Sequence, residues 1–139
     1  MKLSSRAIGW TARAAALLYA AWAVFHLKVA WDIMQLGLTQ TSIAQARTFQ
    51  LAAYMLTIAL FVLIVAVTLN RRNSVIGYWL NLCVAGWADA IWVVVVVLPG
   101  YVGVVRGLLP PAIFLAAAIA STIAKRAVGD VQVDSVPPT

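Results

Sequence analysis

A few side chains in the interiors of the apolar stretches are ionisable or strongly polar and could take part in chemistry. They are His26, Lys28, Gln50, Tyr54, Asn81 and Asp89. Asp89 is the most unusual because it lies within VAGWADAIWVVVVVLPGYVG, a segment of Val, Ile and Trp that an aqueous helix would not tolerate. Placing a carboxyl group in apolar surroundings costs free energy, so such a group has a polar partner or is retained for a function. We therefore expect Asp89 to be the residue on which function depends most.

Helical spacing groups the polar side chains into one stripe on each of three expected helices. The stripes consist of Tyr19, Trp22 and His26, then Arg47, Gln50, Tyr54 and Thr57, then Asn81, Ala85, Asp89 and Trp92. Because polar groups inside a membrane need partners, we expect all three stripes to face the interior of one bundle.

The depths of the stripes can be compared by counting about 1.5 Å per residue from the basic residues at the helix ends. His26 then lies about 20 Å inside, and Tyr54 and Asp89 lie about 25 Å inside. We therefore predict that His26, Tyr54 and Asp89 are catalytic residues in one layer of the outer half of the membrane. The residues predicted to surround this layer and bind a ligand are Trp22, Gln50, Trp92, Asn81 and Arg47.

Each of these residues also has a structural interpretation. Asp89 could be a hydrogen-bonded structural acid, and His26 could form a bond between helices. Tyr54, Gln50 and Asn81 are of types that commonly hold membrane helices together. The sequence leaves these alternatives open.

The residue counts exclude several familiar chemistries. The chain has a single cysteine, Cys83, and a single histidine, His26. They cannot form an internal disulfide, a CxxC redox pair or bis-histidine haem ligation within one chain. The sequence also has no cluster with metal-ligand spacing and no Gly-rich phosphate loop. We therefore expect no metal and no cofactor, and haem only if His26 residues of several subunits share it.

The elements that must position these residues follow from the composition. The chain has 139 residues, is 64% hydrophobic and 10% charged, and has a mean hydropathy of +0.96. A soluble domain of this size could not bury so much apolar surface, so the surrounding medium must be lipid. Four stretches, residues 10–36, 49–69, 75–98 and 108–124, are long enough to span a bilayer. The sequence therefore predicts an all-α bundle of four transmembrane helices in a single domain, residues 1–126.

The basic residues predict how the bundle is oriented. Most of the Lys and Arg residues would lie at the end with both termini and the turn between the second and third helices, namely Lys2, Arg6, Arg13, Arg71, Arg72, Lys125 and Arg126. We therefore expect cytoplasmic N- and C-termini in a bacterial inner (plasma) membrane. Residues 127–139 are expected to be a disordered cytoplasmic tail. Lys28 and Asp32, four residues apart, should pair near the outer interface.

Two classes of function fit these observations. In the first, the bundle holds a polar pocket for a hydrophobic small molecule, and Asp89 acts as acid or base in a cofactor-free isomerisation, cyclisation or hydrolysis. In the second, the protein is a proton- or cation-linked transporter or channel, or an accessory subunit of a larger membrane complex. Four helices are barely enough to enclose a path, so transport would imply a homo-oligomer. The expected partner is the lipid bilayer. The basic residues do not cluster on one soluble face, which argues against binding of nucleic acid.

Overall fold

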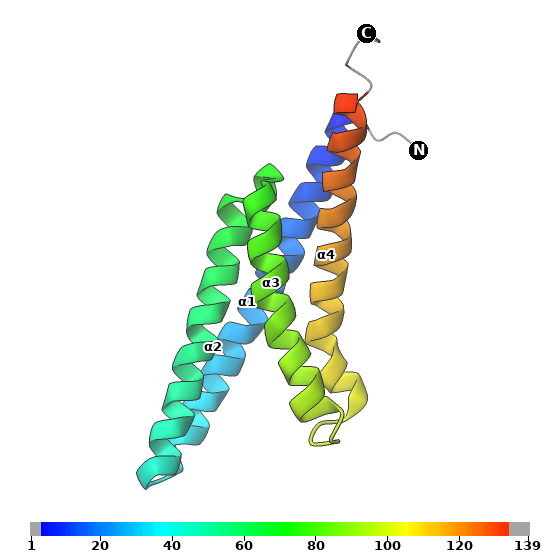
Figure 1. The fold of residues 1–139 in the computed structure, drawn as a ribbon. Coiled ribbons are helices and arrows are strands. Elements are labelled where there is room, and N and C mark those ends of the chain that lie inside the picture. Colours follow the sequence, from blue (N-terminus) through cyan, green and yellow to red (C-terminus); the bar gives the residue numbers. More distant parts are fainter. Residues whose placement is uncertain (1–3, 134–139) are drawn as a thin grey trace.

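The computed structural model describes residues 4–133, with side chains described as far as Val128. This part of the chain is helical and contains no strand. Its elements are α1 (Ser5–Leu38), α2 (Ser42–Thr68), η1 (Asn70–Arg72), α3 (Val75–Trp92), η2 (Val93–Val97) and α4 (Val104–Val133) (Figure 1). Four segments are long and apolar enough to cross a membrane, Ser5–Leu38, Ser42–Arg72, Val75–Val97 and Val104–Val128. The predicted all-α chain with four helices of membrane-spanning character is therefore confirmed.

Consecutive helices run in opposite directions and form two hairpins, α1–α2 and α3–α4 (Figure 1). The start of α1 and the end of α4 lie at the same end of the bundle as the turn between α2 and α3. We call this the terminal end. The α1–α2 and α3–α4 turns lie at the opposite, distal end, toward which the two hairpins diverge (Figure 1).

Short polar residues begin two of the helices. Ser4 Oγ accepts a hydrogen bond from the Ala7 backbone N at 3.3 Å, and Ser74 Oγ accepts one from the Gly77 backbone N at 3.4 Å. Asn73 precedes the second cap and has a φ of 54°, in the left-handed region that Asn tolerates better than most residues. This tight turn starts α3 directly after η1 and returns it alongside α2.

The helices extend beyond the predicted spans at several ends. α1 covers Ser5–Leu38, and α2 begins at Ser42 rather than at residue 49. α4 continues to Val133, so residues 127–133 of the expected disordered tail are helical in the structure, whereas residues 134–139 lie outside the described residues. Hydropathy identifies the length of chain that crosses lipid, but a helix can continue into polar sequence beyond it. At about 1.5 Å per residue, α1 is about 51 Å long, against about 30 Å for the hydrocarbon core of a bilayer.

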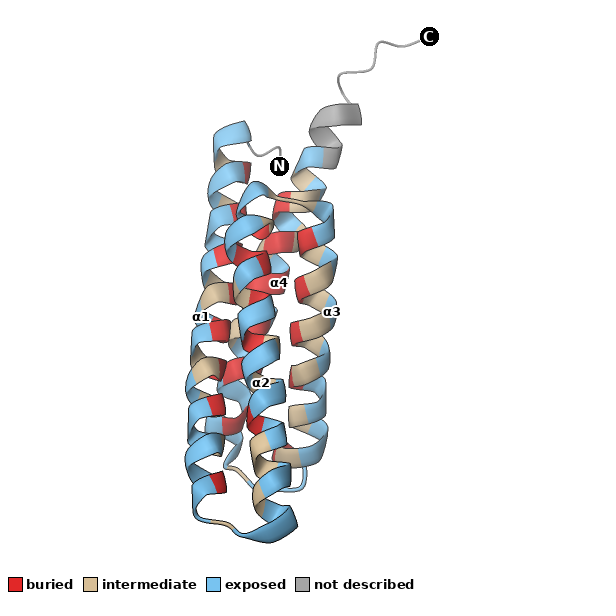
Figure 2. Cartoon of the chain, turned by 90° about the vertical axis from the view of Figure 1, so that its left-hand side faces the viewer, coloured by how far each residue is buried: buried red, intermediate tan, exposed pale blue. Residues whose placement is uncertain are grey.

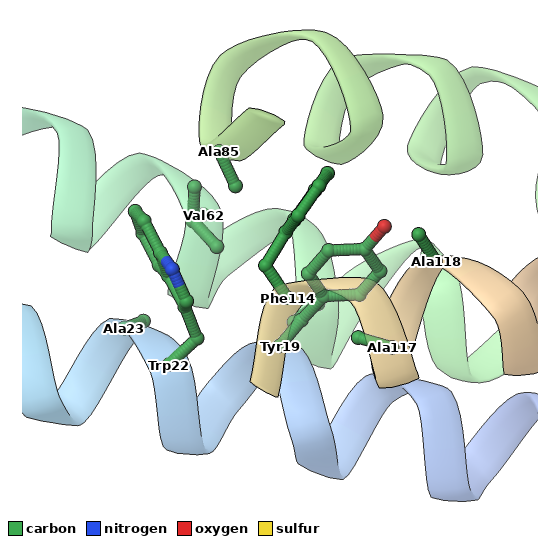
Figure 3. Packing of buried hydrophobic residues seen from close by; sticks show 9 residues of the cluster. Tyr19, Trp22, Ala23, Val62, Ala85, Phe114, Ala117 and Ala118 are labelled. Atoms are coloured by element: carbon green, nitrogen blue, oxygen red, sulfur yellow. The ribbon is translucent and has the colours of Figure 1, made fainter. Parts of the chain in front are cut away.

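Small residues dominate the buried faces, which lets the helices approach one another closely. Figure 2 shows the buried residues on the inward faces and exposed residues on the outside. On α1 the buried series Ala12, Ala15, Tyr19, Trp22 and His26 advances by three or four residues, the spacing typical of helical bundles. In the centre, Tyr19 and Trp22 of α1 pack with residues from the other three helices, Val62, Ala66, Ala85, Phe114, Ala117 and Ala118 (Figure 3).

The end of α3 is irregular where it meets the start of α4. Residues Val93–Val97 form a π-helical turn directly after Trp92. A Cβ atom at Gly107 would lie 2.7 Å from Cγ2 of Val97, so the glycine allows α4 to approach this turn. Pro110 and Pro111 follow inside α4, and each removes one N–H donor from the helix.

Candidate functional site

A hydrogen bond between Trp22 and Asp89 joins α1 to α3 in the interior of the bundle. The indole Nε1 of Trp22 donates to Oδ2 of Asp89 at 3.0 Å, and the two residues are only 0% and 4% exposed. Spacings of three and four residues place Tyr19, Trp22 and His26 on the buried face of α1. Asn81 and Asp89 lie on the buried face of α3. The polar stripes of α1 and α3 therefore meet inside the bundle.

His26 lies against the face of the same indole ring. The ring centroids of Trp22 and His26 are 3.7 Å apart, with an interplanar angle of 28°. Nδ1 of His26 lies 2.8 Å from the backbone O of Trp22. Because a carbonyl oxygen can only accept, Nδ1 carries a proton and donates it in this contact. A neutral His26 therefore has its unprotonated nitrogen at Nε2.

Trp22, His26 and Asp89, which we call the indole cluster, leave two acid–base atoms free. Within residues 4–128, neither Oδ1 of Asp89 nor Nε2 of His26 makes a hydrogen bond. The side-chain atoms that are fully enclosed without a partner belong to other residues, Tyr19, Asn70 and Asn81. Asp89 and His26 therefore each keep an atom that a ligand or a water molecule could reach.

No basic side chain pairs with Asp89 in the described part of the chain. The ion pair found there joins Lys28 Nζ to Asp32 Oδ2 at 2.6 Å between exposed side chains, as the sequence predicts. The partner of Asp89 is instead a neutral indole N–H, which can donate to a carboxylate and to a carboxylic acid alike. The same residues contain no group of three or more His, Cys, Asp or Glu side chains that could hold a metal ion. The titratable groups of the indole cluster are thus one carboxyl and one imidazole.

Asp89 and His26 do not line either of two hollows on the surface of the chain. One hollow of about 590 Å³ lies at the terminal end, and one of about 330 Å³ lies on the outer face of α4. Between Asp89 and His26 lies the indole of Trp22, whose edge bonds one and whose face stacks on the other. A ligand at the indole cluster would therefore contact or displace this ring.

Tyr54 does not join the indole cluster, so the predicted layer of His26, Tyr54 and Asp89 is wrong in one member. The side chain of Tyr54 is 58% exposed on α2, and its hydroxyl accepts a hydrogen bond from Gln50 Nε2 at 2.6 Å. Arg47 Nη1 in turn donates to Gln50 Oε1 at 3.3 Å. Arg47, Gln50 and Tyr54, which we call the α2 row, thus lie together on the outside of the bundle.

The outward position of the α2 row has two physical reasons. The three side chains form hydrogen bonds with one another, so they do not need partners in the interior. The segment Ser42–Arg72 also has the most apolar 18-residue window of the four spans, with a mean hydropathy of 2.6. Exposed Leu60, Phe61 and Ile64 show that apolar residues there lie on the outer face as well, so they do not mark a buried face. The buried face of α2 is formed mainly by small and β-branched residues instead, Ala52, Ala59, Val62, Val65 and Ala66.

Trp92 and Asn81, predicted to bind a ligand, make contacts within the bundle. Nε1 of Trp92 donates to the backbone O of Gly107 at 2.8 Å. Pro111 lies four residues after Gly107 and has no N–H to donate to this oxygen, so the indole supplies the missing donor. Asn81 is fully buried, and its Nδ2 lies 3.4 Å from the backbone O of Val62 on α2. These two side chains connect α3 to α4 and to α2.

Two interior features were not predicted from the sequence. Trp22 was expected to bind a ligand but is the direct partner of Asp89. The sequence placed Trp22 beside the predicted layer that contains Asp89, whereas the rotation of each helix that brings the two side chains together was not visible. Ser121 is buried on α4, a helix to which the sequence assigned no polar stripe. A single serine among alanines gives little signal because small residues are common throughout membrane helices.

Comparison of the chain with protein-family models, with curated proteins and with solved structures finds no match. Any role for the indole cluster therefore rests on its own geometry. That geometry is a carboxyl and an imidazole held by one buried indole, which bonds Asp89 through its edge and stacks on His26 through its face.

Proposed function

We propose that the protein is a multi-pass membrane enzyme that transfers protons to and from a lipophilic substrate, with Asp89 and His26 as the acid–base pair. The observation that supports this proposal is the indole of Trp22, which holds both groups and leaves Oδ1 of Asp89 and Nε2 of His26 free. A donor and an acceptor held in fixed positions can protonate one atom of a substrate and deprotonate another. Cofactor-free isomerisation, ring opening or cyclisation needs no further chemical group.

The hydrogen bonds of the indole cluster favour one assignment of roles. The indole N–H occupies Oδ2 of Asp89, so a transferable proton on this carboxyl belongs on Oδ1. His26 donates through Nδ1 to the Trp22 carbonyl, so its Nε2 is the basic atom. Asp89 is therefore the general acid and His26 the general base in this proposal. The substrate is lipophilic because the helices around the cluster expose apolar side chains to the bilayer, among them Trp87 and Ile91 beside Asp89.

Two aspartates whose side chains the structure describes, Asp89 and Asp32, offer a matched test. Asp89→Asn removes the buried carboxyl, and Asp32→Asn removes the exposed one that pairs with Lys28. Membranes containing each variant are incubated with a lipid extract in D₂O, and lipophiles that are converted or take up deuterium are followed by mass spectrometry. We expect conversion with the unmodified chain and with Asp32→Asn, and a rate at least about 100-fold lower with Asp89→Asn, the usual contribution of a general acid.

A second measurement separates enzyme from transporter. The purified chain in proteoliposomes is tested for proton flux with an internal pH-sensitive dye, again comparing Asp89→Asn with Asp32→Asn. Asp89-dependent flux without conversion of any lipophile would replace the enzyme proposal with a proton-linked transporter formed by several copies of the chain. If the unmodified chain, Asp89→Asn and Asp32→Asn behave equally in both assays, the enzyme and the transporter proposals are both contradicted. That result would favour an accessory subunit.

We also propose that the terminal end of the bundle faces the cytoplasm. Arg6, Arg13, Arg71, Arg72 and Arg126 lie toward this end, and basic residues are enriched on the cytoplasmic side of membrane proteins. Reporter fusions at Asn73 and Tyr101, which lie in turns at opposite ends, should report opposite sides, with Asn73 cytoplasmic. Activity of the cytoplasmic reporter at Tyr101 alone would reverse the orientation.

A further inference from the structure

A groove at the terminal end of the bundle combines three guanidinium groups with an apolar floor. Its volume is about 590 Å³, within the range of small-molecule sites. α1, α2 and η1 all contribute to its lining, which consists of Trp10, Arg13, Ala16, Leu17, Ala20, Val67, Arg71 and Arg72. The indole cluster and the α2 row contribute nothing to it.

The groove exists because α1 presents small side chains where it passes the end of α2. Ala16 and Ala20 lie four residues apart on one face of α1, and Arg13 lies one turn before them on the same face. Val67 borders the hollow from α2. The alanines leave space that larger side chains would fill.

The polar and apolar parts of the groove are ordered along the bundle. Arg13 lies nearer the terminal end than Ala20 on the same helix, and Arg71 and Arg72 lie nearer that end than Val67. The guanidinium groups therefore form a rim where lipid headgroups would lie, and the apolar floor continues toward the hydrocarbon layer. A phospholipid in the leaflet at the terminal end has the same order, with its charged headgroup outermost and its acyl chains toward the hydrocarbon layer.

Within residues 4–128, where side chains are described, no carboxylate is paired with the arginines of the rim. The acids in that range are Asp32, which pairs with Lys28, and Asp89, which is bonded by Trp22 in the interior. The guanidinium carbon of Arg13 lies 5.4 Å from the ring centroid of Trp10, a contact that orients the charge without cancelling it. The rim therefore presents charged donors to an anion, and guanidinium groups match phosphate oxygens well.

We infer that this groove binds one acidic phospholipid. Its phosphate contacts Arg13, Arg71 and Arg72, and the start of one acyl chain lies on Leu17, Ala20 and Val67. The usual excess of arginines on the cytoplasmic side accounts for the charge but does not require a groove with a small-residue floor. A soluble anion would use the rim alone and leave that floor uncovered, which favours a lipid as the occupant. This site is independent of the proposed enzyme activity.

Native mass spectrometry of the full chain tests the inference. The protein in detergent is titrated with phosphatidylglycerol or with phosphatidylcholine of the same acyl chains, and bound lipid per chain is measured. We expect one phosphatidylglycerol to be retained in preference to phosphatidylcholine. Arg71→Gln/Arg72→Gln should weaken retention about 25-fold, at about fivefold for each basic residue near an anionic headgroup. Thermal unfolding in phosphatidylcholine alone checks that the variant is folded.

Two further variants separate a specific groove from general attraction. Arg6→Gln/Arg126→Gln removes the same charge from exposed positions at the terminal end outside the groove, and should change retention less than twofold. Ala20→Leu keeps every arginine but fills the floor, and should lower lipid retention while leaving the weak binding of inorganic phosphate unchanged. Equal loss in the two arginine pairs, no effect of Ala20→Leu, or competition by millimolar inorganic phosphate would each overturn the assignment to a lipid.

Discussion

The indole cluster and the α2 row are both built from polar side chains at helical spacing in apolar helices, yet one is buried and the other is exposed. In the cluster, Trp22 and Asp89 come from different helices, and their hydrogen bond forms only when α1 and α3 pack together. In the row, Gln50 bonds both Arg47 and Tyr54 along a single helix. The hydrogen-bonding groups of the α2 row are therefore paired before the helices pack, whereas those of Trp22 and Asp89 in the indole cluster are not.

This difference shows what a polar stripe in a membrane helix does and does not indicate. A stripe whose members can bond one another at spacings of three and four has no need of an interior position. Asp89 makes no such bond on α3, because Ala85 has no polar side chain and the indole of Trp92, three residues later, donates to Gly107 instead. The partner of Asp89 has to come from another helix, which makes a lone acid a better marker of the interior than a series of polar residues.

The largest expected effect on stability distinguishes a buried tryptophan from an exposed one. Trp22 is 0% exposed and Trp87 is 71% exposed, although both are tryptophans at the level of the helix interiors. Trp22→Ala removes a buried indole and the donor to Asp89, and should lower the free energy of unfolding by about 3–5 kcal/mol. Trp87→Ala should change it by less than about 0.5 kcal/mol. Unfolding in mixed detergent micelles measures both, and equal losses would contradict the buried position of Trp22.

A smaller change isolates the hydrogen bond within the indole cluster. Trp22→Phe keeps an aromatic ring but removes the donor to Oδ2 of Asp89, and should cost about 1–3 kcal/mol because the carboxyl is left unpaired in the interior. In an Asp89→Leu background the same substitution should cost clearly less, since no carboxyl remains to be bonded. Independent effects of the two substitutions in this double-mutant cycle would show that the bond contributes nothing.

The fold was predictable to a greater extent than the site. Hydropathy and length located the four helices, because lipid requires about 20 apolar residues for each crossing. The ends were less predictable, since α1 and α4 continue as helices into polar sequence that hydropathy does not mark. The buried positions of His26 and Asp89 followed from their cost in lipid. The rotation of α2 did not, because its polar stripe lies on the outside, while apolar residues occupy both the inner and the outer face.

Trp92 shows why a contact can be partly visible in sequence and still be missed. The missing N–H of Pro111 can be inferred from the sequence alone, and with it the free carbonyl of Gly107. Which donor replaces it depends on how η2 and the following turn bring α3 against α4. Nothing in the sequence pattern of Trp92 distinguishes that role from a place in the wall of a ligand site.

The Trp92 contact gives a third, intermediate prediction. Trp92→Phe should lower the free energy of unfolding by about 1 kcal/mol, because the carbonyl of Gly107 loses its donor in a partly buried position. In a Pro111→Ala background the new backbone N–H can bond the same carbonyl, so Trp92→Phe should then have little effect. The same cost in both backgrounds would mean that Trp92 acts through packing alone.

The smallest expected effect concerns the α2 row, and it tests the comparison most directly. Tyr54→Phe removes the hydroxyl that accepts from Gln50, but both side chains are exposed, and Gln50 remains bonded to Arg47. The free energy of unfolding should change by less than about 0.5 kcal/mol, and any activity that depends on Asp89 should be unaffected.

Ala52→Leu provides the control for Tyr54→Phe on the same helix. Ala52 is 2% exposed and faces the other helices, so a larger side chain there should cost about 1–3 kcal/mol by overpacking. Comparing the two losses in free energy of unfolding determines the rotation of α2. If Tyr54 faced inward and Ala52 outward, Tyr54→Phe would cost more than Ala52→Leu. A loss of Asp89-dependent activity in Tyr54→Phe at unchanged stability would instead return Tyr54 to the site. Because Trp22 and Asp89 are buried within the bundle and the α2 row lies on its outside, that result would contradict the outward orientation of Tyr54.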